Sequence, residues 1–134
     1  MSPYREVEHT ADWSLEVWAP TLAALFVDAA QGMYALAGAR PAPGAGERQR
    51  VECQGDDYEV LLVGWLQEWL YRTEMHNQVF EAFQIDRLTP TGLSGSAVGR
   101  PTERLDKLIK AATYHNLKIE ATAEGFAATI VLDV

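Results

Sequence analysis

The chain has little basic charge and almost no cysteine. Among its 134 residues, 11 are Lys or Arg and 19 are Asp or Glu, which gives a formal net charge of −8. Proteins that bind nucleic acids by themselves usually neutralise phosphates with Lys and Arg, so we expect no strong direct nucleic-acid binding. The single cysteine, Cys53, excludes an intramolecular disulfide and a zinc site built from several cysteines. This charge favours a metal ion or a basic protein surface as partner.

Long hydrophobic runs are absent as well. The sequence lacks the roughly 18 consecutive apolar residues of a membrane-spanning helix, so no membrane contact is expected. Its N-terminus also lacks the basic segment and apolar core of a signal peptide, and the expected location is therefore the cytoplasm. With 48% hydrophobic residues and this length, the chain is expected to fold as one domain over residues 1–134.

The pattern of apolar residues predicts an α+β fold. Apolar residues at helical spacing predict one helix over residues 22–37, capped by Thr21, and a second over residues 57–75. Asp56 and Glu59 resemble a capping box for the second helix. Period-two alternation and turn residues predict strands at 4–9, 14–19, 48–54, 79–88, 92–99, 117–122 and 126–134, with loops at 37–47 and 100–106. We therefore expect two amphipathic helices packed on a mostly antiparallel sheet.

The stretch EHTADWSLEV, residues 8–17, places Asp12 directly before the second predicted strand. The simpler interpretation is a turn residue whose carboxylate accepts a hydrogen bond from a nearby backbone N–H. The alternative is a ligand of a hard cation, or a general base. Because Ca²⁺ and Mg²⁺ need several oxygen ligands, a cation site at Asp12 requires further carboxylates from elsewhere in the chain.

The last two residues could supply these carboxylates. Asp133 has a side-chain carboxylate, and Val134 carries the α-carboxylate of the chain as given. If the first and last strands are neighbours, Asp12, Asp133 and Val134 form a pocket for a divalent ion, and their oxygen ligands suit Ca²⁺, Mg²⁺ or Mn²⁺. The alternative interpretation of Asp133 is a solvated strand end, and local residue chemistry favours it.

Other residues with reactive or ligating side chains form weaker patterns. His9, His76 and His115 lack the close spacing of zinc ligands. Ser14, with His9 and Asp12, lacks the sequence context of a hydrolase nucleophile. These patterns disfavour a zinc site and a serine hydrolase.

Two further stretches have a structural and a functional interpretation. Trp65 and Trp69 lie on the apolar face of the second predicted helix, so we expect them in the core rather than as platforms for stacked bases. The polar stretch KAATYHNL, residues 110–117, either begins a strand with polar caps or presents His115 and Asn116 to a ligand or partner.

Four segments together resemble the archease family, small proteins that activate the tRNA-splicing RNA ligase. They are EHTADWSLEV (8–17), LLVGWLQEWLY (61–71), KAATYHNL (110–117) and IVLDV (130–134). The resemblance covers nearly the whole chain. It implies a non-catalytic protein that promotes guanylylation and multiple turnover of the ligase in RNA end joining. It also implies a metal site, with calcium in relatives, at Asp12, Asp133 and Val134.

The sequence departs from the family pattern at two places. Family members carry a longer polar segment with a histidine where this chain has RPTERLDKLI, residues 100–109. Trp13 stands where an aliphatic residue is common. Two other functions remain as alternatives: a chaperone-like interaction module, and a small metal-dependent phosphohydrolase that uses Asp12 and Asp133.

Overall fold

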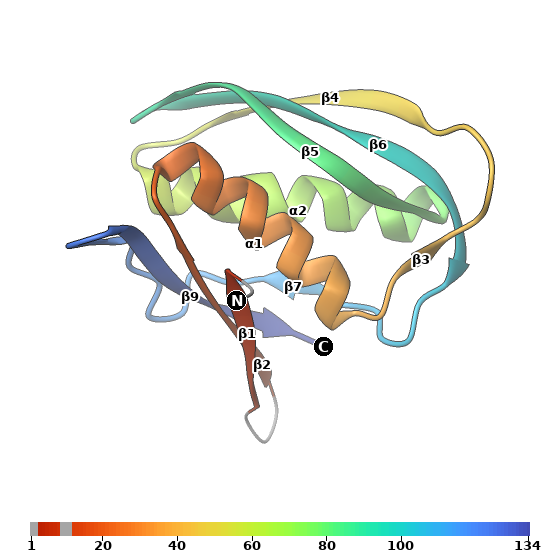
Figure 1. Cartoon of the computed structure of the whole chain (residues 1–134), viewed down its shortest axis with the longest axis horizontal. Coiled ribbons are helices and arrows are strands. Elements are labelled where there is room, and N and C mark those ends of the chain that lie inside the picture. The colour runs from red at the N-terminus through yellow and green to blue at the C-terminus, as the bar shows by residue number, and fades with distance from the viewer. Residues whose placement is uncertain (1–2, 9–11) are drawn as a thin grey trace.

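The computed structural model describes residues 3–8 and 12–134, so His9 lies outside the described residues (Figure 1). Its elements follow the order β1 (Tyr4–Glu8), β2 (Asp12–Ala19), α1 (Leu22–Leu36), β3 (Arg40–Pro41), β4 (Glu47–Gln54), α2 (Tyr58–His76), β5 (Gln78–Thr89), β6 (Gly92–Arg104), β7 (Ala111–Ala112), β8 (Glu120–Thr122) and β9 (Gly125–Asp133). Neither helix in this part of the chain is long and apolar enough to cross a membrane.

The strands form two antiparallel sheets, with the helices between them (Figure 1). One sheet has the order β1-β2-β9-β7, with β8 also paired to β9, and the other has the order β3-β6-β4, with β5 paired to β6. The predicted α+β fold is confirmed, but the expected single sheet is two sheets. The apolar surface of α2 explains this difference. Its buried residues include the consecutive Leu61, Leu62 and Val63, which at about 100° per residue spread over roughly 200° of the helix surface, so both sides need a covering layer.

Aromatic side chains fill the space between the sheets. Trp65 and Trp69 are fully buried, as predicted, and their rings meet edge to face with centroids 5.4 Å apart. The Trp65 indole N–H donates to the Phe26 carbonyl oxygen at 3.0 Å, which joins α2 to α1. The Tyr34 hydroxyl on α1 donates to the Trp69 carbonyl oxygen at 3.1 Å. These two bonds satisfy buried polar groups and fix the helices to each other.

Two predicted loops contain strand residues, and the strand predicted at 117–122 is shorter in the structure, where β8 spans only Glu120–Thr122. Residues 100–106 were predicted as a loop, but β6 continues to Arg104, and Pro101 and Thr102 pair with Gln78 and Pro41. The predicted loop 37–47 correspondingly contains β3. Proline usually disfavours a strand interior because it lacks an N–H, but Pro101 still accepts a hydrogen bond from the Ala42 N–H through its carbonyl oxygen, at 2.8 Å.

The start of α2 corrects the predicted capping box. Asp57, not Asp56, is the N-cap, and its carboxylate accepts a hydrogen bond from the Val60 N–H at 2.8 Å. Glu59 turns away from the cap and accepts from the Ile119 N–H at 3.0 Å, so it ties the helix to a distant segment. The predicted cap at Thr21 is confirmed, since its side chain accepts from the Ala24 N–H at 3.1 Å.

The two adjacent aspartates give a direct test of this cap. We expect Asp57→Ala to lower the free energy of unfolding by about 1 kcal/mol, because the Val60 N–H loses its partner. The matched change Asp56→Ala should stay within about 0.5 kcal/mol of the original protein. Chemical denaturation followed by circular dichroism measures both, and equal losses for the two variants would contradict the assignment.

Candidate functional site

The structure brings Asp12 and Asp133 together at one end of a strand pair. Strands β2 and β9 pair in antiparallel register over eight residues, and Asp12 lies directly opposite Asp133 in the terminal pair. Residues that face each other in a ladder point to the same side of the sheet. The two carboxylates therefore share one face, although they lie 121 positions apart in the sequence.

The hydrogen bonds of β9 show how close the two side chains come. The Asp133 carbonyl oxygen accepts from the Lys110 N–H at 2.8 Å, and the Val131 carbonyl oxygen accepts from the Thr113 N–H at 3.0 Å. The main-chain groups of these alternate residues of β9 thus point away from β2. Asp12 and Asp133 consequently form a non-hydrogen-bonded pair, the kind in which facing Cα atoms approach to about 4.5 Å and side chains lie closest.

The surroundings of this pair hold the strand end in place. Asp133 is exposed and Asp12 is half-buried, while the half-buried Val134 packs against the core next to them. On its other edge Asp133 pairs with Ala111 of β7. Asp133 is thus paired with a strand on each side, with Asp12 on one edge and Ala111 on the other. In a chain that ends at Val134, the α-carboxylate lies one residue from the aspartate pair.

The carboxylates of Asp12 and Asp133 are the type of ligand that a hard cation prefers, but two side chains alone supply too few oxygen ligands. Within residues 3–8 and 12–134, no cluster of three His, Cys, Asp or Glu side chains could hold a metal ion. A cation at this edge would therefore take two aspartates as side-chain ligands. Its remaining oxygen ligands would be the Val134 carboxylate and water, which Ca²⁺ and Mg²⁺ commonly accept.

The stretch KAATYHNL forms a short strand followed by an exposed polar turn. Its first part forms β7 and supports Asp133, and the Ala112 N–H donates to the Gln67 side-chain oxygen of α2 at 2.6 Å. Its second part turns outward: Tyr114 is 56% exposed, His115 is exposed, and Asn116 has a left-handed backbone with φ of 52°. The structure therefore places the polar end of this stretch on the surface.

Ser14 and Cys53 could act as nucleophiles by residue type, but their surroundings in the fold disfavour this. Ser14 lies two residues from Asp12 on the same face of β2, but it is only 1% exposed. Burial raises the pKa of the Cys53 thiol, the negative charge of Glu68 raises it further, and Arg72 opposes the change. The thiol therefore stays protonated near neutral pH, unlike the thiolates of reactive cysteines.

These features define a class: a small α+β protein with two helices between two antiparallel sheets and a pair of facing aspartates at the end of the β2–β9 ladder. The model of the archease protein family (MTH1598/TM1083) matches residues 4–134. The chain belongs to the archease family, which confirms the resemblance of the four sequence segments.

Two archeases match the sequence of this chain over nearly their whole length. The archease of Methanopyrus kandleri is 33% identical over 139 residues, which cover 98% of this chain and 99% of the relative. The archease of Archaeoglobus fulgidus is 31% identical and covers 98% of each chain.

Two solved structures share the fold. Protein 1598 of Methanobacterium thermoautotrophicum superposes with a TM-score of 0.75 at 27% identity, over 100% of both chains. An archease of Thermotoga maritima, described as a possible chaperone, gives a TM-score of 0.73 at 20% identity, over 97% of this chain and 96% of that one.

The facing aspartates make the edge electrostatically unfavourable without a cation. Like charges directly opposite in a ladder destabilise it, so in a chelating buffer we expect Asp133→Asn to raise the free energy of unfolding by about 0.2–1 kcal/mol. The gain should grow at low ionic strength, where screening is weaker.

Glu52 provides the matched control, because it lies in the β4–β6 ladder opposite the neutral Ser94. Glu52→Gln should change stability less than Asp133→Asn does under the same conditions. Urea denaturation at two salt concentrations measures both variants. A loss of stability in Asp133→Asn would contradict a repulsive pair.

Proposed function

We propose that this archease is a non-catalytic activator of the tRNA-splicing RNA ligase, and that it promotes ligase guanylylation and multiple turnover. The observation that carries the proposal is the facing pair of Asp12 and Asp133 in a member of this family. The two aspartates, with the α-carboxylate of Val134, would hold one divalent ion, with Ca²⁺ as the first candidate and Mg²⁺ or Mn²⁺ as alternatives.

The position of the pair suits a site that acts on another protein. Asp133 is exposed at the end of its strand, so a partner can approach it, while the ladder from Asp12 to Ala19 keeps the pair rigid. A bound divalent ion would supply charge neutralisation to phosphate oxygens during nucleotidyl transfer. The chain's own residues orient the ligands, because Lys110 and Ala111 fix the backbone of Asp133.

The charge of the protein supports docking on the ligase rather than on RNA. With 19 acidic and 11 basic residues, the chain cannot neutralise many phosphates. An acidic activator can instead bind a basic surface of the enzyme that holds the RNA. As part of the same proposal, the protein acts in the cytoplasm, where the ligase would meet its RNA.

Two alternatives predict different behaviour. The first is a chaperone-like function, in line with the Thermotoga maritima archease, which is described as a possible chaperone. Such a protein would protect unrelated proteins from aggregation. A metal-dependent phosphohydrolase would need only this chain, a metal ion and a phosphoester. The burial of Ser14 beside Asp12 argues against a serine nucleophile in such an enzyme.

A guanylylation assay with the ligase of the same organism tests the proposal. We expect the protein to accelerate formation of the ligase–guanylate adduct and to allow more than one turnover per ligase. Asp12→Ala and Asp133→Ala should each lower this stimulation at least tenfold, because each removes a charged ligand from a site with few ligands.

Glu52→Gln, on the outer face of the other sheet, is the control and should stimulate fully. Full stimulation by both aspartate variants would contradict the role of the metal site. A lack of stimulation by the original protein would contradict the activator function. Protection of unrelated aggregating proteins in its place would then favour the chaperone alternative.

A further inference from the structure

Strand β7 is the edge strand next to the aspartate pair, and it is only two residues long. In the order β1-β2-β9-β7 it follows β9, with Ala111 opposite Asp133 and Ala112 opposite Leu132. The Asp133 carbonyl oxygen also accepts from the Lys110 N–H at 2.8 Å. Asp133 is therefore held by β2 on one edge and by this short strand on the other.

A side chain of α2 fixes this short strand. A strand of two residues gains few ladder hydrogen bonds and has little stability of its own. Ala112 is only 5% exposed, so its N–H needs a partner within the protein. That partner is the side-chain oxygen of the half-buried Gln67, which accepts the hydrogen bond at 2.6 Å. Without it, a buried N–H would be left unpaired at the edge of the sheet.

Gln67 joins β7 to a firmly packed part of the helix. Its neighbours Leu66 and Trp69 are fully buried between the two sheets, so the backbone of α2 cannot shift easily at this point. Glutamine also supplies a neutral acceptor. It therefore orients β7 without adding a third negative charge near two aspartates that already repel each other.

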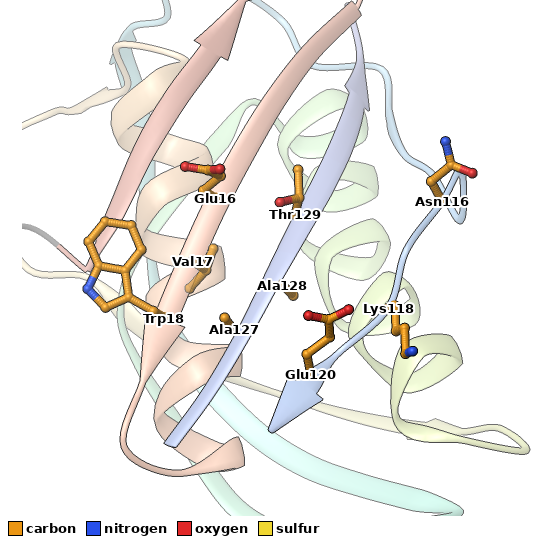
Figure 2. Close-up of a pocket in the computed structure, with 9 residues that line it drawn as sticks. All are labelled: Glu16, Val17, Trp18, Asn116, Lys118, Glu120, Ala127, Ala128 and Thr129. Atoms are coloured by element: carbon orange, nitrogen blue, oxygen red, sulfur yellow. The ribbon is translucent and has the colours of Figure 1, made fainter. Parts of the chain in front are cut away.

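Glu59 makes a similar attachment about two turns earlier in α2. Its carboxylate accepts from the Ile119 N–H at 3.0 Å, and Glu59 is half-buried like Gln67. The segment held there runs from Asn116 to Glu120. Figure 2 shows Asn116 to one side of β9 and Glu120 next to it, where β8 begins to pair with β9.

The two attachments differ in their distance from the aspartate pair. Glu120 lies opposite Ala127, near the start of β9 and roughly 20 Å from Asp133 at 3.3 Å per residue. Ala112 lies opposite Leu132, directly next to Asp133. A side chain that only stabilises the fold would act alike at either place, whereas one that positions Asp133 must act at β7.

We propose that Gln67 is a positioning residue of the cation site. By holding β7 on α2, it fixes the backbone of Asp133 where its carboxylate and that of Asp12 reach the same divalent ion. Gln67 itself is not a ligand. Groups that orient metal ligands change the affinity for the metal without binding it. This inference rests on the proposed cation site of Asp12, Asp133 and Val134.

Calorimetric titration with Ca²⁺ tests the proposal on variants of Gln67. Gln67→Met keeps the length of the side chain and its preference for a helix, but it removes the acceptor. It should lower the affinity for Ca²⁺ about tenfold, the low end of the range for residues that support a metal ligand. Gln67→Asn, whose side chain is one carbon shorter, should shift the affinity in the same direction. Gln67→Glu keeps the acceptor and should stay within about threefold of the original protein.

The matched control is Glu59→Met, which removes the other acceptor of α2. In urea denaturation with a chelator it should lower the midpoint as Gln67→Met does, yet leave the affinity for Ca²⁺ within about twofold. Hydrogen exchange of the metal-free protein, followed by NMR, gives a second measurement. The Lys110 amide, which donates to Asp133, should exchange faster in Gln67→Met and not in Glu59→Met.

The outcomes separate this proposal from the cation site itself. If the original protein binds Ca²⁺ and Gln67→Met binds it equally well, the positioning role is wrong and the site stands. Equal losses of affinity in Gln67→Met and Glu59→Met would also overturn the role, because they would show a general effect of stability. No binding by the original protein would contradict the site and the role together. NMR spectra show whether each variant is folded, and Gln67→Asn replaces Gln67→Met if the latter is not.

Discussion

The antiparallel pairing of β2 with β9 is the contact on which the candidate site depends. It joins the N-terminal and C-terminal parts of the chain in a ladder of eight residue pairs, from Asp12 opposite Asp133 to Ala19 opposite Phe126. Its inner face buries Leu15 and Ile130 against the helices, with exposed fractions of 1% and 0%. Each such side chain contributes about 1.5–3 kcal/mol, so apolar burial holds two like charges in a position they would otherwise avoid.

The helices extend this constraint to the outer edge of the sheet. Trp65 fixes α2 to α1 through the Phe26 carbonyl, and Gln67 and Glu59 of α2 hold the segment that follows β7. That segment supports Asp133 at one end and joins β9 again further along. The attachment at Gln67 therefore extends the order of the helices to the aspartate pair.

Local patterns in the sequence were sufficient for the helices and for the residues of the core. The periodicity of α2 located Trp65 and Trp69 in the interior, where the structure has them. The cap of α2 was misplaced by one residue because Asp56 and Asp57 are both good capping residues, and only the backbone geometry separates them. Strand β6 was predicted to end at Gly99 instead of Arg104 because Pro101 locally resembles a strand end.

Strand partners could not be read from the same patterns. Alternation shows which side chains of a strand share a face, but it does not show which strand lies next to it. The sequence patterns therefore did not reveal that the strands form two sheets instead of one. The pairing of Asp12 with Asp133 needs the exact register, since a slip by one residue would put them on opposite faces. The contact of Gln67 with β7 had no sequence signal, because a polar residue in a helix does not show which distant backbone group it will meet.

Isothermal titration calorimetry with Ca²⁺ tests the central claim most directly, namely that the β2–β9 ladder builds a cation site from its terminal pair. We expect one ion per chain for the original protein and for Glu52→Gln. Asp12→Asn and Asp133→Asn should each lose most of the affinity, and a chain extended beyond Val134 should bind more weakly. Absence of binding, or an affinity that neither aspartate variant changes, would contradict the account.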